Sequence, residues 1–272
     1  IRWNGEEELS VGGAGFGAAQ IRASQIQQAF RTLVNEMEAD LCALHIAASR
    51  AHGTAGTTPF GTAGDYTDAS LARKILVDNG AGESDLHLVM NTAAGANIRG
   101  KQARVDEAGT TSILRQGVLQ DVGGMMLRES GQIVTFTKGT GASATTNAAG
   151  YAVGATVITL AAVGTGTILA GDVITFAGDS NQYVVASGDT DVSNAGTITL
   201  AAPGLKVAMS AATKAITVVA SSARNMAFQG LSRAPGVVEQ VAAVTGADLM
   251  GLPLDAPNAA IKPVRRLTAP CA

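Results

Sequence analysis

The chain has 272 residues, with 19 lysines and arginines against 22 aspartates and glutamates. This near balance excludes a strongly basic nucleic-acid-binding protein of the histone type. Hydrophobic residues make up 46% and charged residues 15%, which excludes an intrinsically disordered chain. The two cysteines, Cys42 and Cys271, form no C-x-x-C motif, and no apolar run reaches the roughly 18 residues of a membrane span. We therefore expect a folded protein with no membrane partner.

Charged side chains divide the chain into three blocks. Residues 1–129 carry 26 of them, residues 130–222 carry 7 and residues 223–272 carry 8. The middle block has no arginine but has 15 threonines, a composition that favours strands over helices. These shifts predict domain borders near residues 130 and 222.

A long helix is predicted in the first block, between Ser24 and Gly53. Ser24 and Gln27 form a capping box at its start, and Gly53 supplies a left-handed stop. The apolar residues recur every three or four positions, and they form one stripe of Ile26, Phe30, Leu33, Met37, Leu41, Leu44 and Ala48. We expect the stripe to lie across another part of the structure. The reverse face should then meet solvent or a neighbour through Gln28, Arg31, Asn35 and Glu38.

Shorter helices and strands are predicted over the rest of the first block. Helices should run from Thr67 or Asp68 to Gly80, over residues 92–98, and from Thr110 or Thr111 to Leu119. Strands are expected at 86–90 and 125–133. This mixture is typical of an α/β or α+β domain.

The middle block reads as five short strands, rich in β-branched residues, at 157–160, 172–176, 182–185, 197–200 and 215–219. Glycine, asparagine, aspartate and proline separate them, as in a small antiparallel barrel or sandwich. Four aspartates are interpreted as turn formers: Asp172, Asp179, Asp189 and Asp191.

Catalytic and cofactor motifs give no support for an enzyme. The glycine-rich segment 12–17 lacks the G-x-G-x-x-G spacing and no buried strand precedes it, so a plain loop is the better interpretation. Glu38, Cys42 and His45 share a helical face, with His52 two turns beyond and His87 elsewhere, but no second cluster completes a metal site. We expect no enzymatic activity, no metal and no cofactor.

Four parts of the sequence resemble the coat proteins of tailed phages and their prophages. They are residues 1–8 (IRWNGEEE), 31–36 with 38–41 (RTLVNE, EADL), 166–178 (GTILAGDVITFAG), and 202–205 with 225–228 (APGL, NMAF). The similarity is to the P-twenty-two-type branch, which has a Hong-Kong-97-like fold with an inserted β-barrel. It covers about residues 1–229, and the segment around 170–178 is its most specific part.

This resemblance implies an α+β fold in four regions. Residues 1–20 would end an extended loop, and residues 21–134 would form a peripheral spine helix with an axial α/β region. Residues 135–222 would be the inserted β-barrel, whereas residues 223–272 are expected to form an irregular tail that departs from the family. Subunit-interface candidates on this view are Trp3, Glu6, Glu7, Glu8, Arg31, Asn35 and Glu38.

The function implied is that of a major capsid protein, many copies of which close into an icosahedral shell. Its partners would be other copies of itself, scaffolding and portal proteins, and packaged DNA held without sequence specificity. The protein would be found in the virion capsid and, during assembly, in the host cytoplasm.

Two differences from the family suggest an alternative to an intact capsid protein. The arm that precedes the position of Ile1 is absent, and residues 229–272, with five of the seven prolines, do not match the family's C-terminal segment. A truncated or frame-shifted prophage copy would behave as a monomer or small oligomer, because sheet edges would be left unpaired. A second alternative is a β-rich, adhesin-like binding module, which the threonine- and glycine-rich block suggests but which leaves the long helix unexplained.

Overall fold

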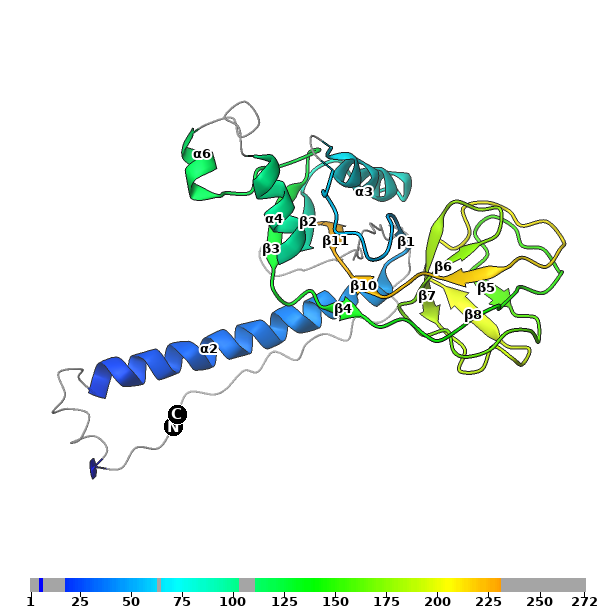
Figure 1. Cartoon of the computed structure of the whole chain (residues 1–272), viewed down its shortest axis with the longest axis horizontal. Coiled ribbons are helices and arrows are strands. Elements are labelled where there is room, and N and C mark those ends of the chain that lie inside the picture. The colour runs from blue at the N-terminus through cyan, green and yellow to red at the C-terminus, as the bar shows by residue number, and fades with distance from the viewer. Residues whose placement is uncertain (1–4, 7–17, 63–64, 103–110, 231–272) are drawn as a thin grey trace, which may run out of the picture.

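The computed structural model describes residues 5–6, 18–62, 65–102 and 111–230 (Figure 1). The fold is mixed α+β, as the sequence predicts, with helices, a small mixed sheet and a separate β-rich part. Several sequence predictions lie outside the described residues: Trp3, Glu7, Glu8, the segment 12–17 and residues 231–272.

The long helix α2 spans Ala18–Cys42, and both predicted ends are wrong. Ser24 lies inside the helix, where its hydroxyl donates to the carbonyl of Gln20 (3.0 Å) instead of capping the first turn. At the other end α2 passes into a 3-10 helix, η1 (Ala43–Ala47), and the chain becomes extended at Ala48. The helix ends where the chain docks on the rest of the protein, which no local capping pattern encodes. Its 25 residues make a rod of about 37 Å.

A three-stranded sheet with helices beside it forms the α/β part. Strand β2 (Leu86–Asn91) lies between β11 (Met226–Gln229), which is antiparallel to it, and β3 (Met126–Ser130), which is parallel. The helices are α3 (Thr67–Asp78), α4 (Thr92–Lys101) and α6 (Thr111–Gln116). The predicted elements are therefore present, and the irregular tail predicted from residue 223 is wrong as far as Gln229.

Some boundaries in this part differ from prediction for local reasons. The N-cap of α3 is Tyr66, and Asp68 instead accepts a hydrogen bond from the backbone N–H of Phe60 (2.7 Å). The N-cap of α4 is Asn91, whose side chain accepts from the N–H of Ala94 (3.0 Å). Helix α6 stops before Gly117, which adopts a positive φ of 63° that ends a helix readily.

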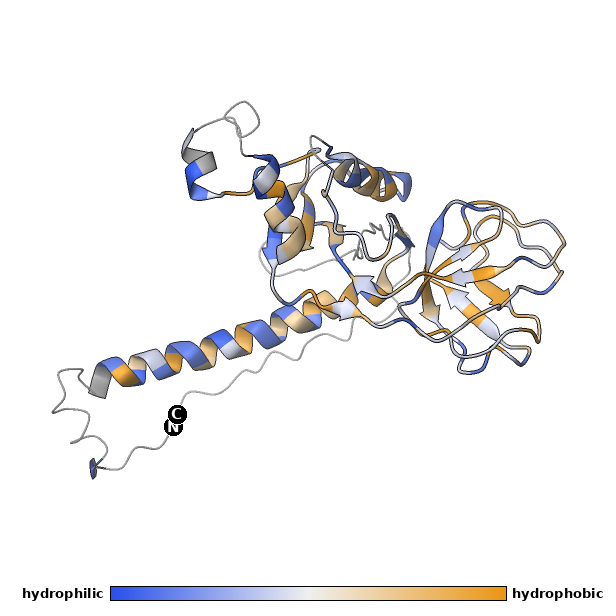
Figure 2. Cartoon of the chain, in the orientation of Figure 1, coloured by the Kyte–Doolittle hydropathy of each residue, from blue (hydrophilic) through white to orange (hydrophobic). Residues whose placement is uncertain are grey.

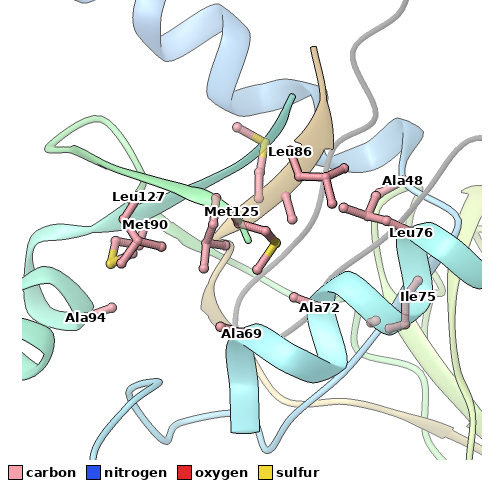
Figure 3. Packing of buried hydrophobic residues seen from close by; sticks show 14 of the residues in the cluster. Ala48, Ala69, Ala72, Ile75, Leu76, Leu86, Met90, Ala94, Met125 and Leu127 are labelled. Atoms are coloured by element: carbon pink, nitrogen blue, oxygen red, sulfur yellow. The ribbon is translucent and has the colours of Figure 1, made fainter. Parts of the chain in front are cut away.

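The core of the α/β part consists of small and aliphatic side chains (Figure 3). Helix α3 contributes Ala69, Ala72 and Leu76, all fully buried, and the two small alanines let the helix approach the sheet closely. Strands β2 and β3 contribute residues from one face each, including Leu86, Met90 and Leu127. Val173, Val184 and Ala201 from the β-rich part join the same core, so the two parts are packed together.

The β-rich part contains the five predicted strands in a sheet of order β5-β8-β7-β6-β9. They are β5 (Val157–Thr159), β6 (Val173–Phe176), β7 (Gln182–Ser187), β8 (Thr197–Leu200) and β9 (Ile216–Val218), and neighbours are antiparallel. The segment 144–146 forms hydrogen bonds at both outer edges of this sheet. Just after β5, the Ala161 N–H donates to the Thr145 carbonyl (2.9 Å), and in β9 the Ile216 N–H donates to the Ala144 carbonyl (2.8 Å). One segment thus connects the two edges of the sheet.

Two short features attach the β-rich part to the rest of the chain. Strand β1 (Arg50–Ala51) pairs with β7, and β4 (Thr135–Phe136) pairs with β10 (Ser222–Ala223) at the point where the chain enters and leaves. Buried Arg50 donates to the side-chain oxygen of Asn181 (3.1 Å) and forms an ion pair with Asp78 at the end of α3 (3.4 Å). These contacts fix the β-rich part against α3.

The β-rich part has a core of its own, from which we predict independent folding. Every buried member of this second cluster lies between Ala144 and Ile216, among them Phe176, Tyr183 and Ile198. A fragment of residues 130–222 is therefore expected to give dispersed amide resonances and a β-type circular dichroism spectrum, although it lacks β1. A random-coil spectrum in both measurements would show that the domain border is misplaced.

Candidate assembly surface

Among the described residues, helix α2 meets the body of the protein at its C-terminal end (Figure 1). Cys42 packs against the α/β core, and its sulfur lies 3.8 Å from the hydroxyl of Ser130 in β3. The turns before Cys42 extend away from the body, and their side chains are exposed or, at a few positions, half-buried. The helix therefore presents almost its full length to whatever surrounds the protein.

The described residues leave the apolar stripe along α2 largely uncovered, whereas the sequence predicts that it lies across another part of the structure. Ile26, Phe30, Leu33, Met37 and Leu41, here called the α2 stripe, retain between 50% and 63% of their accessible surface. Figure 2 shows the hydrophobic residues recurring along the helix between hydrophilic ones. Large apolar side chains in a continuous row on one helix face mark an interaction surface in a folded protein.

The predicted polar interface residues lie on α2 where the sequence places them. Arg31 and Asn35 are exposed and Glu38 is half-buried, while Glu6 is exposed in a short described segment apart from the helix. The sequence-based choice of interface candidates included these polar groups but omitted the α2 stripe. The three- and four-residue spacing of the apolar residues predicts that the helix has an apolar face, but it does not show whether that face is covered.

Because Arg31 is exposed, its replacement is expected to leave the monomer intact. An Arg31→Glu variant should unfold within about 0.5 kcal/mol of the wild type, as exposed substitutions usually do. Chemical denaturation followed by circular dichroism measures this. A loss of several kcal/mol would show that this face of α2 is buried after all, and any change in assembly could not then be assigned to an interface.

A partly buried cluster lies at the end of α2, where three parts of the chain meet. The ring of Phe136 in β4 lies edge-on to His45 of η1 (centroids 5.1 Å apart) and is covered by the guanidinium of Arg224 (5.1 Å). Arg224 is 1% exposed, and Asp172 at the start of β6 is fully buried nearby. The interpretation of Asp172 as a simple turn former is therefore incomplete, because its carboxylate lies inside the protein.

Asp172 holds two backbone segments together. Its carboxylate accepts hydrogen bonds from the N–H groups of Leu169 (2.7 Å) and Gly139 (3.0 Å). Burial raises the pKa of Asp172, and these N–H donors with the positive charges of Arg224 and Lys138 oppose the rise. The buried charge fixes the strand entering the β-rich part against the turn that precedes β6.

His45 in this cluster predicts a loss of stability in mild acid. Burial lowers the pKa of His45; the charge of Arg224 adds to this, and a contact with the carbonyl of Cys42 opposes it. The folded state therefore keeps the imidazole neutral while the unfolded chain takes up a proton below about pH 6.5. The free energy of unfolding should fall as the pH drops below 6.5, and His45→Gln should flatten this dependence. An unchanged slope in the variant would contradict the assignment.

No candidate metal site is found among the residues that the structure describes. These residues contain no group of three histidine, cysteine, aspartate or glutamate side chains able to hold an ion. The His45 ring nitrogen Nδ1 contacts the carbonyl of Cys42 (3.1 Å), and the thiol of Cys42 faces Ser130. Burial raises the pKa of the Cys42 thiol, so its reactive thiolate form is disfavoured.

No family model matches the chain, and neither does any curated protein. Within the described part of the chain, no helix combines the length and apolar character needed to cross a membrane. The exposed stripe on α2 is thus the feature on which a functional conclusion has to be built.

Proposed function

We propose that the chain is a structural subunit of an icosahedral phage shell, a major capsid protein with a Hong-Kong-97-like fold and an inserted β-barrel. The resemblance of residues 1–229 to the P-twenty-two-type coat family supports this proposal. So does the architecture, in which a long helix projects from an α/β body and a β-rich part is inserted between residues 135 and 222.

The exposed α2 stripe is the single observation that carries the proposal. Complete burial of a large apolar side chain contributes about 1.5–3 kcal/mol, so a half-exposed one still has roughly 1 kcal/mol to gain. Five such residues in one row give a driving force for association on the order of 5 kcal/mol per copy. A subunit that packs against identical neighbours would cover such a row in the assembled state.

The inserted barrel is supported by the hydrogen bonds of the β-rich part. The segment 144–146 forms hydrogen bonds with residues at the edges next to β5 and β9, as would be expected of a sheet that closes into a barrel. A closed sheet leaves few free edges, which suits a part that decorates a shell without aggregating. The adhesin-like alternative rests on this part alone and does not account for α2.

The charge of the chain suits a shell wall. A net charge of −3 does not provide the dense positive surface that tight binding to DNA requires, so the genome would be enclosed and not gripped. The partners in this role are other copies of the chain, scaffolding and portal proteins during assembly in the host cytoplasm, and then the finished virion. No residue has a catalytic role, and no cofactor takes part.

Sedimentation of the concentrated protein, followed by electron microscopy of the fastest fraction, tests the proposal. Association that grows with protein concentration is expected, with closed or partly closed shells among the products when assembly partners are co-expressed. A chain that stays monomeric at high micromolar concentration, alone and with its co-expressed operon, would contradict the proposed function.

A further inference from the structure

The half-buried ring of His45 lies at the base of α2, where η1 joins the helix to the body of the protein (Figure 1). Its nitrogen Nδ1 is 3.1 Å from the carbonyl oxygen of Cys42. Because a carbonyl oxygen only accepts hydrogen bonds, Nδ1 carries the proton of the neutral ring. The other ring nitrogen, Nε2, is buried and has no hydrogen-bond partner among the described residues. A second proton would therefore add at Nε2, inside the protein.

A cation already shares the aromatic ring against which His45 packs. The ring of Phe136 meets His45 edge-on, with centroids 5.1 Å apart, and the guanidinium of Arg224 lies 5.1 Å from the same Phe136 centroid. Protonation of His45 would bring a second positive charge into this cluster. It would also create a buried Nε2–H donor without an acceptor. Both effects disfavour the docked position of the ring.

The acidic group of the cluster is already committed to other positive groups. The buried carboxylate of Asp172 accepts two backbone N–H groups, and the charges of Arg224 and Lys138 both act on it. A protonated His45 would be the third cation around this one carboxylate. Asp172 therefore offers little compensation for the added charge.

The remaining charged groups around η1 do not hold the imidazole either. Glu38 on α2 is half-buried and acts on the thiol of Cys42. Strand β7 packs against η1, and its Tyr183 already has an acidic partner, as does Arg50 in β1. Among the described residues, no carboxylate is hydrogen-bonded to His45. An imidazolium at this position thus has no described counter-ion of its own.

Release of η1 would disturb little of either core, because none of the residues of η1 is fully buried. A segment of this kind opens locally at a lower free energy than the whole protein unfolds. We propose that His45 is an acid-sensitive switch: its contact with Phe136 and Arg224 fixes the direction of α2 at neutral pH, and protonation releases η1 and the helix. The switch belongs to the single chain and does not rest on the proposed function.

Distances between two spin labels on one chain test the switch. Gln28→Cys on α2 and Ala162→Cys in the β-rich part, both at exposed positions, are introduced into a Cys42→Ser, Cys271→Ser chain that is diluted with unlabelled protein. The docking equilibrium should shift about thirtyfold toward release between pH 7.5 and pH 5.0, since a free imidazole has a pKa of about 6.5. The distance distribution should be narrow at pH 7.5 and broad at pH 5.0.

A reference pair and two substitutions provide the controls. Labels at Ala162→Cys and Ser180→Cys, both within the β-rich part, should keep a narrow distribution at both pH values. His45→Phe keeps a ring against Phe136 but takes up no proton, so α2 should stay fixed at pH 5.0. His45→Lys carries a charge throughout and should give a broad distribution at both pH values. Titration of His45 by proton NMR in the unlabelled cysteine-free chain should match the wild type, which controls for the loss of Cys42.

Three results would overturn the switch. The first is an equally narrow distribution at both pH values in the chain that retains His45. The second is a His45→Phe chain that broadens at pH 5.0 to the same extent, because another group would then release α2. The third is broadening of the reference pair, which would mean global unfolding. All labels are on one chain in dilute protein, so these results leave shell assembly untouched.

Discussion

A Leu33→Asp substitution is expected to lower the affinity between copies at least a hundredfold, about 2.7 kcal/mol, while the monomer stays folded. Leu33 is at the centre of the α2 stripe and half of its surface is exposed, so little packing within the monomer is lost. In the assembled state, however, an unpaired carboxylate would be buried in an apolar contact, which is strongly unfavourable. Light scattering coupled to size-exclusion chromatography measures the association.

Gln28→Glu is the matched control for this substitution. Gln28 lies on the opposite face of the same helix and is exposed, so the variant adds the same charge away from the stripe. We expect near wild-type association for Gln28→Glu and equal circular dichroism spectra for both variants. Equal loss of association in the two variants would mean that net charge, and not the apolar stripe, controls assembly.

Replacing Asp172 with alanine is expected to reduce the free energy of unfolding by about 3–5 kcal/mol, the cost of removing one member of a buried charge cluster. The N–H groups of Leu169 and Gly139 lose their acceptor in a buried site, and Arg224 loses a compensating negative charge.

Urea unfolding measures this loss, with Asp191→Ala as the control in the same β-rich part. Asp191 is exposed and accepts hydrogen bonds from nearby Ser193 and Asn194, so its removal should cost less than about 1 kcal/mol. Similar losses in both variants would show that the Asp172 cluster gives no special support to the junction below α2.

The strands of the β-rich part could be predicted because their determinants are local. Runs of β-branched residues such as those around Val173 and Ile198, separated by glycine and asparagine turns, specify both position and length. Strand β1 could not be found this way. Arg50 and Ala51 form a strand only because Tyr183 and Gln182, far along the chain, present an edge to pair with.

The ends of α2 show the same limit. Ser24 and Gly53 satisfy the sequence rules for a helix start and stop, yet the helix runs from Ala18 to Cys42. The C-terminal end is set by docking of His45 against Phe136, a tertiary contact with a residue from another part of the chain. Local preference of this kind is weak, of the order of 1 kcal/mol for a cap, and packing overrides it.

Only part of the candidate assembly surface could be predicted from the sequence. Periodicity identified the apolar face of α2 and placed Arg31 and Asn35 on the exposed side, and both placements agree with the structure. The periodicity does not show whether the stripe is covered within the chain. Coverage depends on the direction in which α2 extends from η1, which is a property of the tertiary structure. The buried position of Arg224 beside Asp172 was equally invisible, since single charged residues carry no pattern.

Hydrogen exchange along α2, compared between dilute and concentrated protein, tests the central claim most directly. If copies join through the α2 stripe, amides of the central turns from Ile26 to Met37 should exchange much more slowly in the concentrated sample. Amides of the buried strand β7 should exchange alike in both samples and serve as the internal reference. Equal exchange of α2 in both samples, when sedimentation shows that the concentrated protein has associated, would contradict the claim.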